Sequence, residues 1–437
     1  MPRRNLVWLL ALSVVGLACY HKAQRGRYAH TFANAMALVE RRALEPVAGQ
    51  QLFEGAMQGM MSRLGDPYSA YIPPADFQRF NEVLDQQFEG VGMEVWLDPE
   101  TKQLTVGSPI VGSPAYRAGV RAGDRILKID QRATHGLALE EAVKLIRGRK
   151  GESVKVTVLH EGEKEPVELT LVRDTVRVDS VVGDRRNADG SWNYFLEGHE
   201  GLGYLRVNTF GERTVGELQT ALDAMTKQGL RGLALDLRDD PGGLLESAIG
   251  VCDLFLDEGL IVTTRGRRED QIDRAYRASG KGRFLDFPMA VIVNHDSASA
   301  SEVVAACLQD HGRAVVVGER TFGKGTVQEV VDFGEGRGAV RLTVRSYWRP
   351  SNQNIHRRRG ASDDEAWGVL PDEGYAVSVS ADDRMKLRLA RLQRDSQRLR
   401  ANGNGAPANG PPAEVIADVQ LEQAVAYLLK KLATPQQ

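Results

Sequence analysis

The chain has 437 residues, of which 42% are hydrophobic and 26% are charged, as in ordinary globular proteins. This composition excludes a chain that is disordered throughout and a polytopic membrane protein, and the length predicts two to three domains. The 56 Lys and Arg residues nearly balance the 58 Asp and Glu residues, which gives a formal net charge of -2. Because a dominant basic surface is absent, we expect no nucleic-acid partner.

The N-terminus has the pattern of a targeting segment. Arg3 and Arg4 precede an apolar run at 6–18, and Cys19 follows. A basic start before a short apolar stretch is typical of a secretory signal or a signal anchor. Residues 1–25 are therefore predicted to be a signal peptide or a membrane anchor, which places the rest of the chain in the periplasm or cell envelope. Whether the segment is cleaved, retained or lipidated at Cys19 stays open.

The next two regions differ in their hydrophobic period. Residues 26–85 carry apolar side chains at helical spacing and are predicted to form an N-terminal helical region. Residues 86–173 instead contain short alternating runs, such as SVKVTVL at 153–159, separated by glycine-rich turns. With one helix-like segment at 139–147, this pattern predicts a small, partly open β domain.

From 174 to 385, apolar strands and helices alternate, which predicts an α/β domain with a largely buried sheet. Strands are expected at 203–207, 232–237, 290–293 and 314–318, and helices at 216–228, 243–256 and 299–310. The tail, 386–437, is predicted to contain the end of a basic helix, a flexible linker at 401–413 and a last amphipathic helix.

The cysteines and the familiar motifs indicate no cofactor. The three cysteines are widely spaced, and neither CxxC nor a Cys/His cluster at zinc spacing occurs, so no structural metal is expected. Cys252 and Cys307 lie in apolar helix-like runs and are predicted to be buried, inert thiols. HExxH, a Walker-type loop, a dinucleotide fingerprint and GxSxG are all missing from the sequence, so we expect neither a metal nor a nucleotide.

A candidate nucleophile follows the strand at 290–293. The residues HDSASASE at 295–302 lead into a helix, which places Ser299 at a helix N-terminus. Free N–H groups at such a terminus can stabilise a developing oxyanion. A purely structural alternative also fits, because Ser299 and Glu302 match a capping box.

A candidate base lies in the segment GERTFGKGTVQ at 318–328, where Lys324 stands between two glycines. A lysine can deprotonate a serine only when its amine is neutral, and burial lowers the amine's pKa. Ser–Lys pairs are a known variant of the catalytic triad. A surface lysine in a turn is the structural alternative.

A third segment, LRDDPGG at 237–243, ends a strand and opens a helix. The backbone N–H groups of Gly242 and Gly243 could stabilise an oxyanion. The alternative is a strand-to-helix turn that uses glycine only for its backbone freedom.

Together these three segments resemble the carboxyl-terminal processing, or tail-specific, proteases over roughly residues 30–385. The resemblance implies that Ser299 is the nucleophile, that Lys324 is the base and that Gln328 orients the lysine. The oxyanion residues would be Gly242 or Gly243, together with Ala300.

The spacings in this chain and its later blocks agree with that family. Lys324 follows Ser299 by 25 residues, and Gln328 follows Lys324 by 4. The stretches SYWRPS at 346–351 and GVLPD at 368–372 also match. One departure is Asp240, which stands where the family's LRNNPGG-like segment more commonly has Asn.

The β domain resembles a PDZ domain. FEGVGME at 88–94 looks like a carboxylate-binding loop that enters a peptide-binding strand, and residues 113–127 resemble the turn that follows. Backbone N–H groups in such a loop capture a chain-end carboxylate while the peptide adds as a strand. A glycine turn without a ligand is the alternative. The implied peptide-binding residues are Gly90, Val91, Gly92 and Met93.

The predicted fold is multidomain, α/β and β. It comprises an N-terminal helical segment, a PDZ-like partly open β-barrel, an α/β, crotonase-like protease core and C-terminal helices. The predicted function is that of a Ser–Lys endopeptidase that cleaves proteins near their C-termini. The PDZ domain is expected to bind the exposed C-terminal tails of substrates and to gate the site. We expect a homo-oligomer, since the family often forms dimers or rings.

Two alternatives stay open at this point. One is a catalytically inactive PDZ adaptor that binds protein C-termini. The other is a Ser-His-Asp hydrolase that uses His295 or His311, both of which lie near the serine run.

Overall fold

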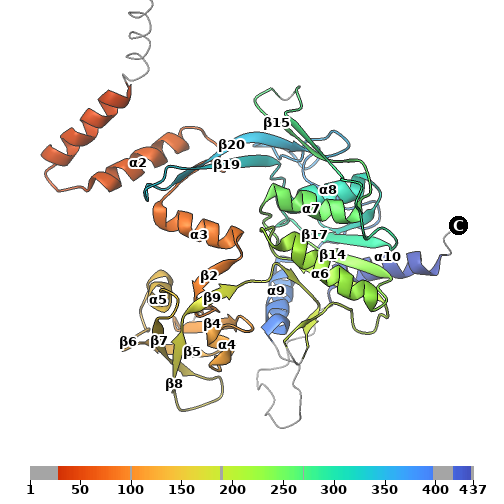
Figure 1. Ribbon diagram of the computed structural model, residues 1–437, viewed down its shortest axis with the longest axis horizontal. Coiled ribbons are helices and arrows are strands. Elements are labelled where there is room, and N and C mark those ends of the chain that lie inside the picture. Colours follow the sequence, from red (N-terminus) through yellow and green to blue (C-terminus); the bar gives the residue numbers. More distant parts are fainter. Residues whose placement is uncertain (1–27, 99–100, 188–189, 269, 397–416, 435–437) are drawn as a thin grey trace, which may run out of the picture. The chain divides into compact units, whose positions relative to one another are not determined.

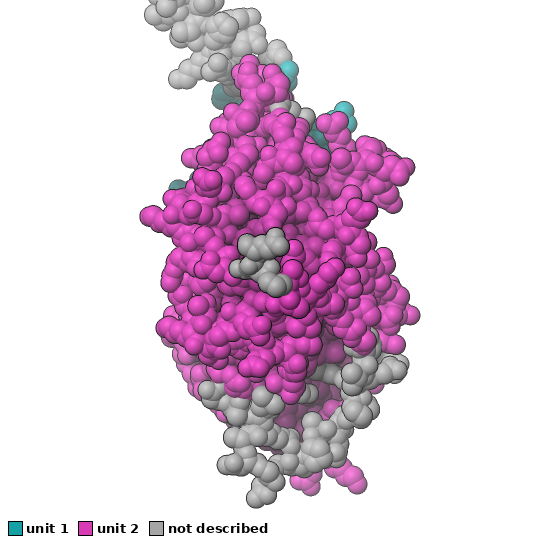
Figure 2. Space-filling view, turned by 90° about the vertical axis from the view of Figure 1, so that its right-hand side faces the viewer, with its two compact units in different colours: residues 1–77, 328–343 teal, residues 78–327, 344–437 magenta. Residues whose placement is uncertain are grey.

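The computed structural model describes residues 28–98, 101–187, 190–268, 270–396 and 417–434. The chain divides into two compact units, one made of residues up to 77 together with 328–343, the other of 78–327 and 344–437 (Figure 2). The targeting segment expected at 1–25 and the linker expected at 401–413 lie outside the described residues. Within the described ranges, none of the helices combines the length and apolar character that crossing a membrane requires.

The first unit contains the expected N-terminal helices and also a strand. Residues 28–42 are helical, and α2 (Gly49–Ser62) follows. β1 (Ala70–Ile72) then pairs antiparallel with the beginning of β20 (Ala339–Trp348). Because Tyr71 packs with Met61 and Val340 in a small core, this part of the predicted helical region is extended instead. α3 (Pro74–Leu84) follows.

The second unit includes the predicted β domain, an open sheet in the order β3-β4-β5-β7-β8, with β6 paired to β5. In β7, Val154, Val156 and Val158 are buried while the residues between them point outward, as the two-residue period of a strand dictates. Its elements are β3 (Met93–Leu97), β4 (Leu104–Pro109), α4 (Pro114–Arg117), β5 (Arg125–Ile129), β6 (Arg132–Ala133), α5 (Leu139–Ile146), β7 (Ser153–Leu159) and β8 (Val167–Val172). At its two ends, β2 (Gln87–Gly90) and β9 (Asp174–Arg177) pair antiparallel.

The predicted α/β domain is confirmed. Its sheet has the order β10-β13-β14-β17-β18, in which β13, β14, β17 and β18 are parallel and β10 is antiparallel. The strands are β10 (Val181–Val182), β13 (Leu202–Val207), β14 (Gly232–Asp236), β17 (Met289–Val293) and β18 (Ala314–Gly318). The helices are α6 (Thr214–Lys227), α7 (Leu245–Phe255), α8 (Ala300–Asp310) and α10 (Val419–Ala433).

Helices cover both faces of this sheet (Figure 1). Leu205, Leu235 and Val291 belong to a core shared with α6, α7 and α8. The alternate residues Tyr204 and Ile292 belong to a second core, shared with α10. Burial on both faces explains why these strands are continuous apolar runs. The segments that carry the predicted active-site residues follow β14, β17 and β18, at the carboxyl edge where ligands bind in open α/β sheets.

The remaining described elements surround this core. β15 (Leu260–Arg265) pairs with β16 (Arg274–Arg277) and with the end of β20, and β19 (Thr326–Asp332) also pairs with β20. β11 (Arg185–Arg186) pairs with β12 (Trp192–Asn193). The basic helix predicted from the sequence is α9 (Ala381–Ser396).

Both described cysteines are buried, as the sequence predicted. Cys252 lies in α7 and Cys307 in α8, and neither is exposed. Burial raises the pKa of the Cys252 thiol well above its ordinary value, so the thiol stays protonated and unreactive.

Candidate active site

Ser299 lies in the tight turn between β17 and α8. β17 ends at Val293 and α8 begins at Ala300, so Ser299 occupies the N-cap position, where it is 5% exposed. Its φ of 57° and ψ of -112° lie in a backbone region that residues other than glycine rarely adopt. Such strain persists only where the surroundings impose it, and it clusters at functional sites.

Glu302 is fully buried and binds the backbone of both predicted catalytic segments. Its Oε2 accepts the N–H groups of Ser299 and Lys324, each at 2.8 Å. Its Oε1 accepts the N–H of Gly323 at 2.7 Å and the hydroxyl of Thr321 at 2.6 Å. The sequence predicted only the bond to Ser299, as half of a capping box. One carboxylate therefore ties the turn of the candidate nucleophile to the loop of the candidate base.

The protonation of Glu302 follows from two opposing effects. Burial raises the pKa of its carboxyl to about 7, while the four donated hydrogen bonds oppose that rise. All four partners are donors, so only the ionised carboxylate accepts all of them. The arrangement around Ser299 and Lys324 is therefore complete when Glu302 is ionised.

Lys324 lies in the loop between β18 and β19, and its side chain is half-buried. Gly323 has a φ of 85°. A Cβ on Gly325 would lie 2.2 Å from the backbone nitrogen of His356, a distance that no side chain tolerates. The two glycines therefore let the lysine loop pass against neighbouring backbone.

Tyr347 is a residue that the sequence did not single out. Burial raises the pKa of its phenol above the ordinary value, and the Ser299 side chain beside the phenol opposes that rise. Its backbone N–H donates to the carbonyl of Gly325 at 2.8 Å. Tyr347 thus contacts both the candidate nucleophile and the lysine loop. The SYWRPS block marked this segment, but nothing in that pattern assigned a role to the tyrosine.

Gly242 brings the LRDDPGG segment against the serine turn. A Cβ on Gly242 would lie 2.9 Å from the Cβ of Ser299 and 2.8 Å from the nitrogen of Ala300. The N–H of Gly242 donates to Asp240 Oδ1 at 2.8 Å. Within the described ranges, by contrast, the N–H groups of Gly243 and Ala300 have no hydrogen-bond acceptor. Of the two glycines, Gly243 is therefore the better candidate for binding an oxyanion.

The structure accounts for Asp240, the departure from the family pattern. Its carboxyl is fully buried, and Oδ2 has no hydrogen-bond partner among the described residues. Burial raises the pKa of this carboxyl well above its ordinary value, which favours the neutral form. A neutral carboxyl offers the N–H of Gly242 the same acceptor that an asparagine would offer.

Gln328, the predicted orienting residue, lies on β19 in the first unit. There its side chain is half-buried, and its Nε2 donates to Thr343 Oγ1 at 3.3 Å. Its role toward Lys324 stays a prediction.

The two histidines considered for a Ser-His-Asp site interact elsewhere. The imidazole of His295 is 3.0 Å from Arg384 Nη1 and 3.7 Å from Glu319. His311 is the C-cap residue of α8, at the helix end opposite Ser299, and its Nε2 is 2.7 Å from the carbonyl oxygen of Leu260.

The predicted carboxylate-binding loop connects β2 and β3. Gly90 ends β2, Val91 is buried, and Met93 begins β3. Gly92 has a φ of 73°, and a Cβ there would lie 2.3 Å from the Cβ of Ser113, whose hydroxyl donates to the Gly92 carbonyl at 2.8 Å. In the described sheet, β3 is an edge strand and α5 packs beside it, which is the setting in which a peptide strand can add.

No group of three or more His, Cys, Asp or Glu side chains is arranged to hold a metal ion in the described parts of the chain.

Family models match three parts of the chain. Residues 201–373 match peptidase family S41, 105–160 match a PDZ domain, and 19–74 match the N-terminal domain of the activating protease CtpB. These three matches correspond to the α/β core, the small β domain and the N-terminal region.

Relatives extend the similarity over most of the chain. A carboxy-terminal-processing protease of Bartonella bacilliformis is 37% identical over 385 residues, which cover 87% of this chain and 83% of that protein. The carboxy-terminal processing protease CtpA of Bacillus subtilis is 33% identical over 332 residues, or 76% and 67% of the two chains. The solved structure of an S41 protease from Bacteroides fragilis shares the fold, with a TM-score of 0.52 at 16% identity over 86% of this chain and 90% of that one. The chain is therefore a serine endopeptidase that belongs to the carboxy-terminal processing proteases.

Proposed function

We propose that Ser299, Lys324 and Gln328 carry out peptide-bond hydrolysis in this chain. The neutral amine of Lys324 takes the proton of Ser299 Oγ, which attacks the scissile carbonyl, and Gln328 orients the amine. The proton passes to the departing amine as the C–N bond breaks and an acyl ester forms on Ser299. Water then attacks this ester, Lys324 takes the proton of the water, and the C–O bond breaks with return of a proton to Ser299.

The observation that carries this proposal is the double contact of Glu302. Ser299 and Lys324 are 25 residues apart in the sequence, yet their backbone N–H groups donate to the same carboxylate oxygen, each at 2.8 Å. Two loops that share one acceptor lie close enough for a hydroxyl on one to meet an amine on the other. A plain capping box needs no second loop on the same carboxylate, so the purely structural reading of this segment is disfavoured.

The oxyanion of the tetrahedral intermediate would be held by backbone donors. The N–H of Ala300 is at the start of α8, where the helix dipole also favours negative charge. The N–H of Gly243 is the second donor, since that of Gly242 is bonded to Asp240. Preorganised donors of this kind stabilise the transition state because they need no reorientation during the reaction.

The substrates that we propose are proteins with exposed C-terminal tails. The tail would add as a strand to the edge of β3, with its carboxylate in the loop at 90–93. This binding would gate the protease site. In support, the chain segments that enter and leave the β domain are both held by one side chain, because Arg213 Nη2 donates to the carbonyls of Gln86 and Val178 at 2.9 Å.

We further propose an exported homo-oligomer, held at the membrane by its N-terminal segment. The basic and apolar pattern of residues 1–25 supports export to the periplasm or cell envelope. The N-terminal helices expose large apolar side chains that a second copy could cover. On the helix at 28–42, Tyr28 is 74% exposed, Phe32 45% and Leu38 54%, and Leu44, in the bend that follows, is 99% exposed.

An inactive PDZ adaptor is not favoured. The relatives that span most of this chain are proteases, and both Ser299 and Lys324 are present. An adaptor would need only the β domain and its peptide-binding edge.

Cleavage of an unfolded model protein with an apolar C-terminal tail tests the proposal. The full chain is compared with Ser299→Ala and Lys324→Ala, and a His295→Ala, His311→Ala double variant serves as the control. Activity in the wild type and the histidine variant, lost in the other two, is the expected result. Activity retained in Lys324→Ala would sink the Ser–Lys mechanism, whereas tail binding without any cleavage would favour the adaptor.

A further inference from the structure

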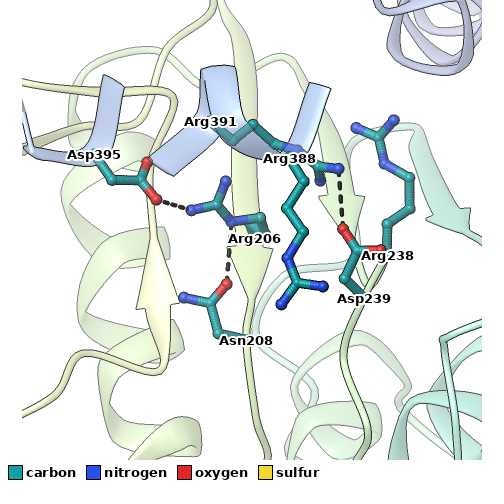
Figure 3. Close-up of a pocket in the computed structure, with 7 residues that line it drawn as sticks. All are labelled: Arg206, Asn208, Arg238, Asp239, Arg388, Arg391 and Asp395. Atoms are coloured by element: carbon teal, nitrogen blue, oxygen red, sulfur yellow. Dashed lines mark hydrogen bonds and ion pairs between the residues drawn. The ribbon is translucent and has the colours of Figure 1, made fainter. Parts of the chain in front are cut away.

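The LRDDPGG segment has a second neighbour besides the turn of Ser299. Figure 3 shows a pocket lined by the end of β13, the residues that follow β14, and α9. Charged side chains dominate its walls. The lining residues are Arg206, Asn208, Arg238, Asp239, Arg388, Arg391 and Asp395.

Arg391 of α9 points into this pocket and reaches the segment directly. It is 5% exposed, and its Nη2 is 3.0 Å from Asp239 Oδ2. Its Nη1 is 3.7 Å from Asp236 Oδ2. The Nε of Arg391 is buried with no hydrogen-bond partner among the described residues. These two carboxylates therefore provide the contacts that hold the guanidinium.

Asp239 is itself held in an unfavourable conformation. Its φ is 62°, in the left-handed region that residues other than glycine seldom adopt. Its N–H donates to Asn294 Oδ1 at 3.0 Å, and Asn294 Nδ2 donates back to Asp239 Oδ1 at 2.8 Å. The other carboxylate oxygen, Oδ2, accepts a hydrogen bond from Arg391 Nη2. The side chain of Asp239 is thus shared between α9 and the end of β17.

The residue after Asp239 contacts both sides of the candidate nucleophile. The backbone carbonyl of Asp240 accepts the N–H of Ala298 at 3.0 Å and the hydroxyl of Ser301 at 3.1 Å. A change in the backbone of Asp239 would therefore be transmitted within one residue to the turn that holds Ser299.

Charged side chains make the contacts between α9 and this segment. The pocket between them has a volume of about 230 Å³ and is lined by polar side chains. A second ion pair, between Asp395 of α9 and Arg206 of β13, lies beside that of Arg391 (Figure 3). Because Arg391 and Asp239 expose only 6% and 17% of their side chains, loss of one partner would leave an uncompensated, largely buried charge.

We propose that Arg391 is a positioning residue for peptide-bond hydrolysis: by pairing with Asp239 it fixes the segment from Asp240 to Gly243 against the turn of Ser299. α9 lies beyond residues 201–373, which match the S41 family model, so this contact brings a helix of the tail into the support of the catalytic site. The inference rests on the proposed function of Ser299 and Gly243.

The test measures kcat and KM of the full chain on an unfolded protein with an apolar C-terminal tail. Arg391→Met keeps most of the stem and removes the charge, Arg391→Lys keeps the charge, and Asp239→Asn removes the partner charge. The matched control is Arg394→Gln on the same helix, because Arg394 is 47% exposed and pairs with Asp184 at 3.3 Å, away from the catalytic segments.

The expected result is a fall in kcat of about 10- to 100-fold in Arg391→Met, with KM within about twofold of wild type, because a misplaced catalytic group costs rate rather than binding. Arg391→Lys should recover most of the rate, and Arg394→Gln should match wild type. In the Arg391→Met, Asp239→Asn double variant, the loss should be no greater than in the worse single variant, since both remove one interaction.

Three outcomes would overturn the inference: a folded Arg391→Met with wild-type kcat, losses that multiply in the double variant, or an equal fall in the control. If Arg391→Met does not fold, Asp239→Asn alone decides, and an unchanged kcat there refutes the role. Failure of the proposed function is distinguishable, because Ser299→Ala and Lys324→Ala would then remain active whatever Arg391 does.

Discussion

The strongest prediction concerns Glu302→Gln, a substitution that keeps the shape of the side chain. The carboxylate accepts two hydrogen bonds on each oxygen, from Ser299 and Lys324 on one and from Gly323 and Thr321 on the other. Glutamine replaces one oxygen by an NH2 group, which then faces two donors. Hydrogen bonds to a charged group contribute about 1.5–3 kcal/mol each, so the loss of two amounts to about 3–6 kcal/mol.

The neutral amide recovers the about 3 kcal/mol that burial of the charge costs, so the net loss stays below the total stability of a domain, about 5–15 kcal/mol. We expect the lysine loop to move before the domain unfolds, because β18, the fully buried strand that precedes the loop, does not depend on Glu302. Peptidase activity should then fall by at least about 100-fold, the size of effect that misplacement of a catalytic group produces. The assay is cleavage of a tail-bearing unfolded protein, with circular dichroism as the check on folding.

The pH dependence of stability provides a second test of the same variant. Burial raises the pKa of Glu302 from its ordinary value of 4.5 to about 7, so the folded state binds this proton more tightly than the unfolded state. The stabilisation is fully present below pH 4.5 and is lost as the pH rises through 7, in total about 3 kcal/mol. Urea unfolding between pH 4.5 and 7.5 should show this decline in wild type, and Glu302→Gln should lack that part of it. Equal slopes in the two proteins, or near-wild-type activity of the folded variant, would refute the reasoning.

Three further substitutions test the neighbouring contacts. Tyr347→Phe removes the phenol oxygen beside Ser299, so kcat should fall by about 2- to 10-fold while the thermal midpoint changes little; an unchanged kcat would show that the phenol has no part in the reaction. Gly325→Ala places a Cβ 2.2 Å from the backbone of His356, so the lysine loop must shift, and activity should drop by about 100-fold or more in a protein that still binds tail peptide. Asp240→Asn should retain activity within about threefold, because the native carboxyl is already neutral. Because the pKa of Asp240 is raised, its protonated carboxyl stabilises the folded wild type, and this stabilisation is lost as the pH rises. The free energy of unfolding of Asp240→Asn should therefore increase relative to that of wild type at alkaline pH. No such increase would contradict a neutral Asp240.

Local patterns predicted much of the fold and the candidate site. A buried strand, a turn of small residues and a helix N-cap are all encoded within about ten residues, and this is why Ser299 could be placed before α8. Gly242 and Gly325 were likewise visible, because close backbone approach requires glycine whatever the partner is. In the same way, the alternating valines of β7 predicted a half-buried strand in the small β domain.

Contacts between distant parts of the chain could not be predicted in this way. Glu302 was expected to cap its own helix, but its bonds to the lysine loop depend on the position of β18 beside β17. Arg391 and Asp239 are separated by 152 residues, and a basic helix gives no sign of which of its arginines becomes buried. Tyr347 reaches the serine turn only because its strand crosses the lysine loop at Gly325.

Three carboxyl groups around Ser299 use three different means of avoiding an uncompensated buried charge. Glu302 is surrounded by neutral donors, Asp240 stays protonated, and Asp239 pairs with the guanidinium of Arg391. Burial raises the pKa of Glu302 to about 7, so we expect the hydrogen bonds of this carboxyl to the serine and lysine loops to change with pH near neutrality. Asp239 responds instead to whatever moves α9, since its partner lies on that helix. The segments that carry Ser299 and Lys324 therefore have two separate supports, the carboxylate of Glu302 and the docking of α9 through Arg391, and these two supports meet at the turn of Ser299.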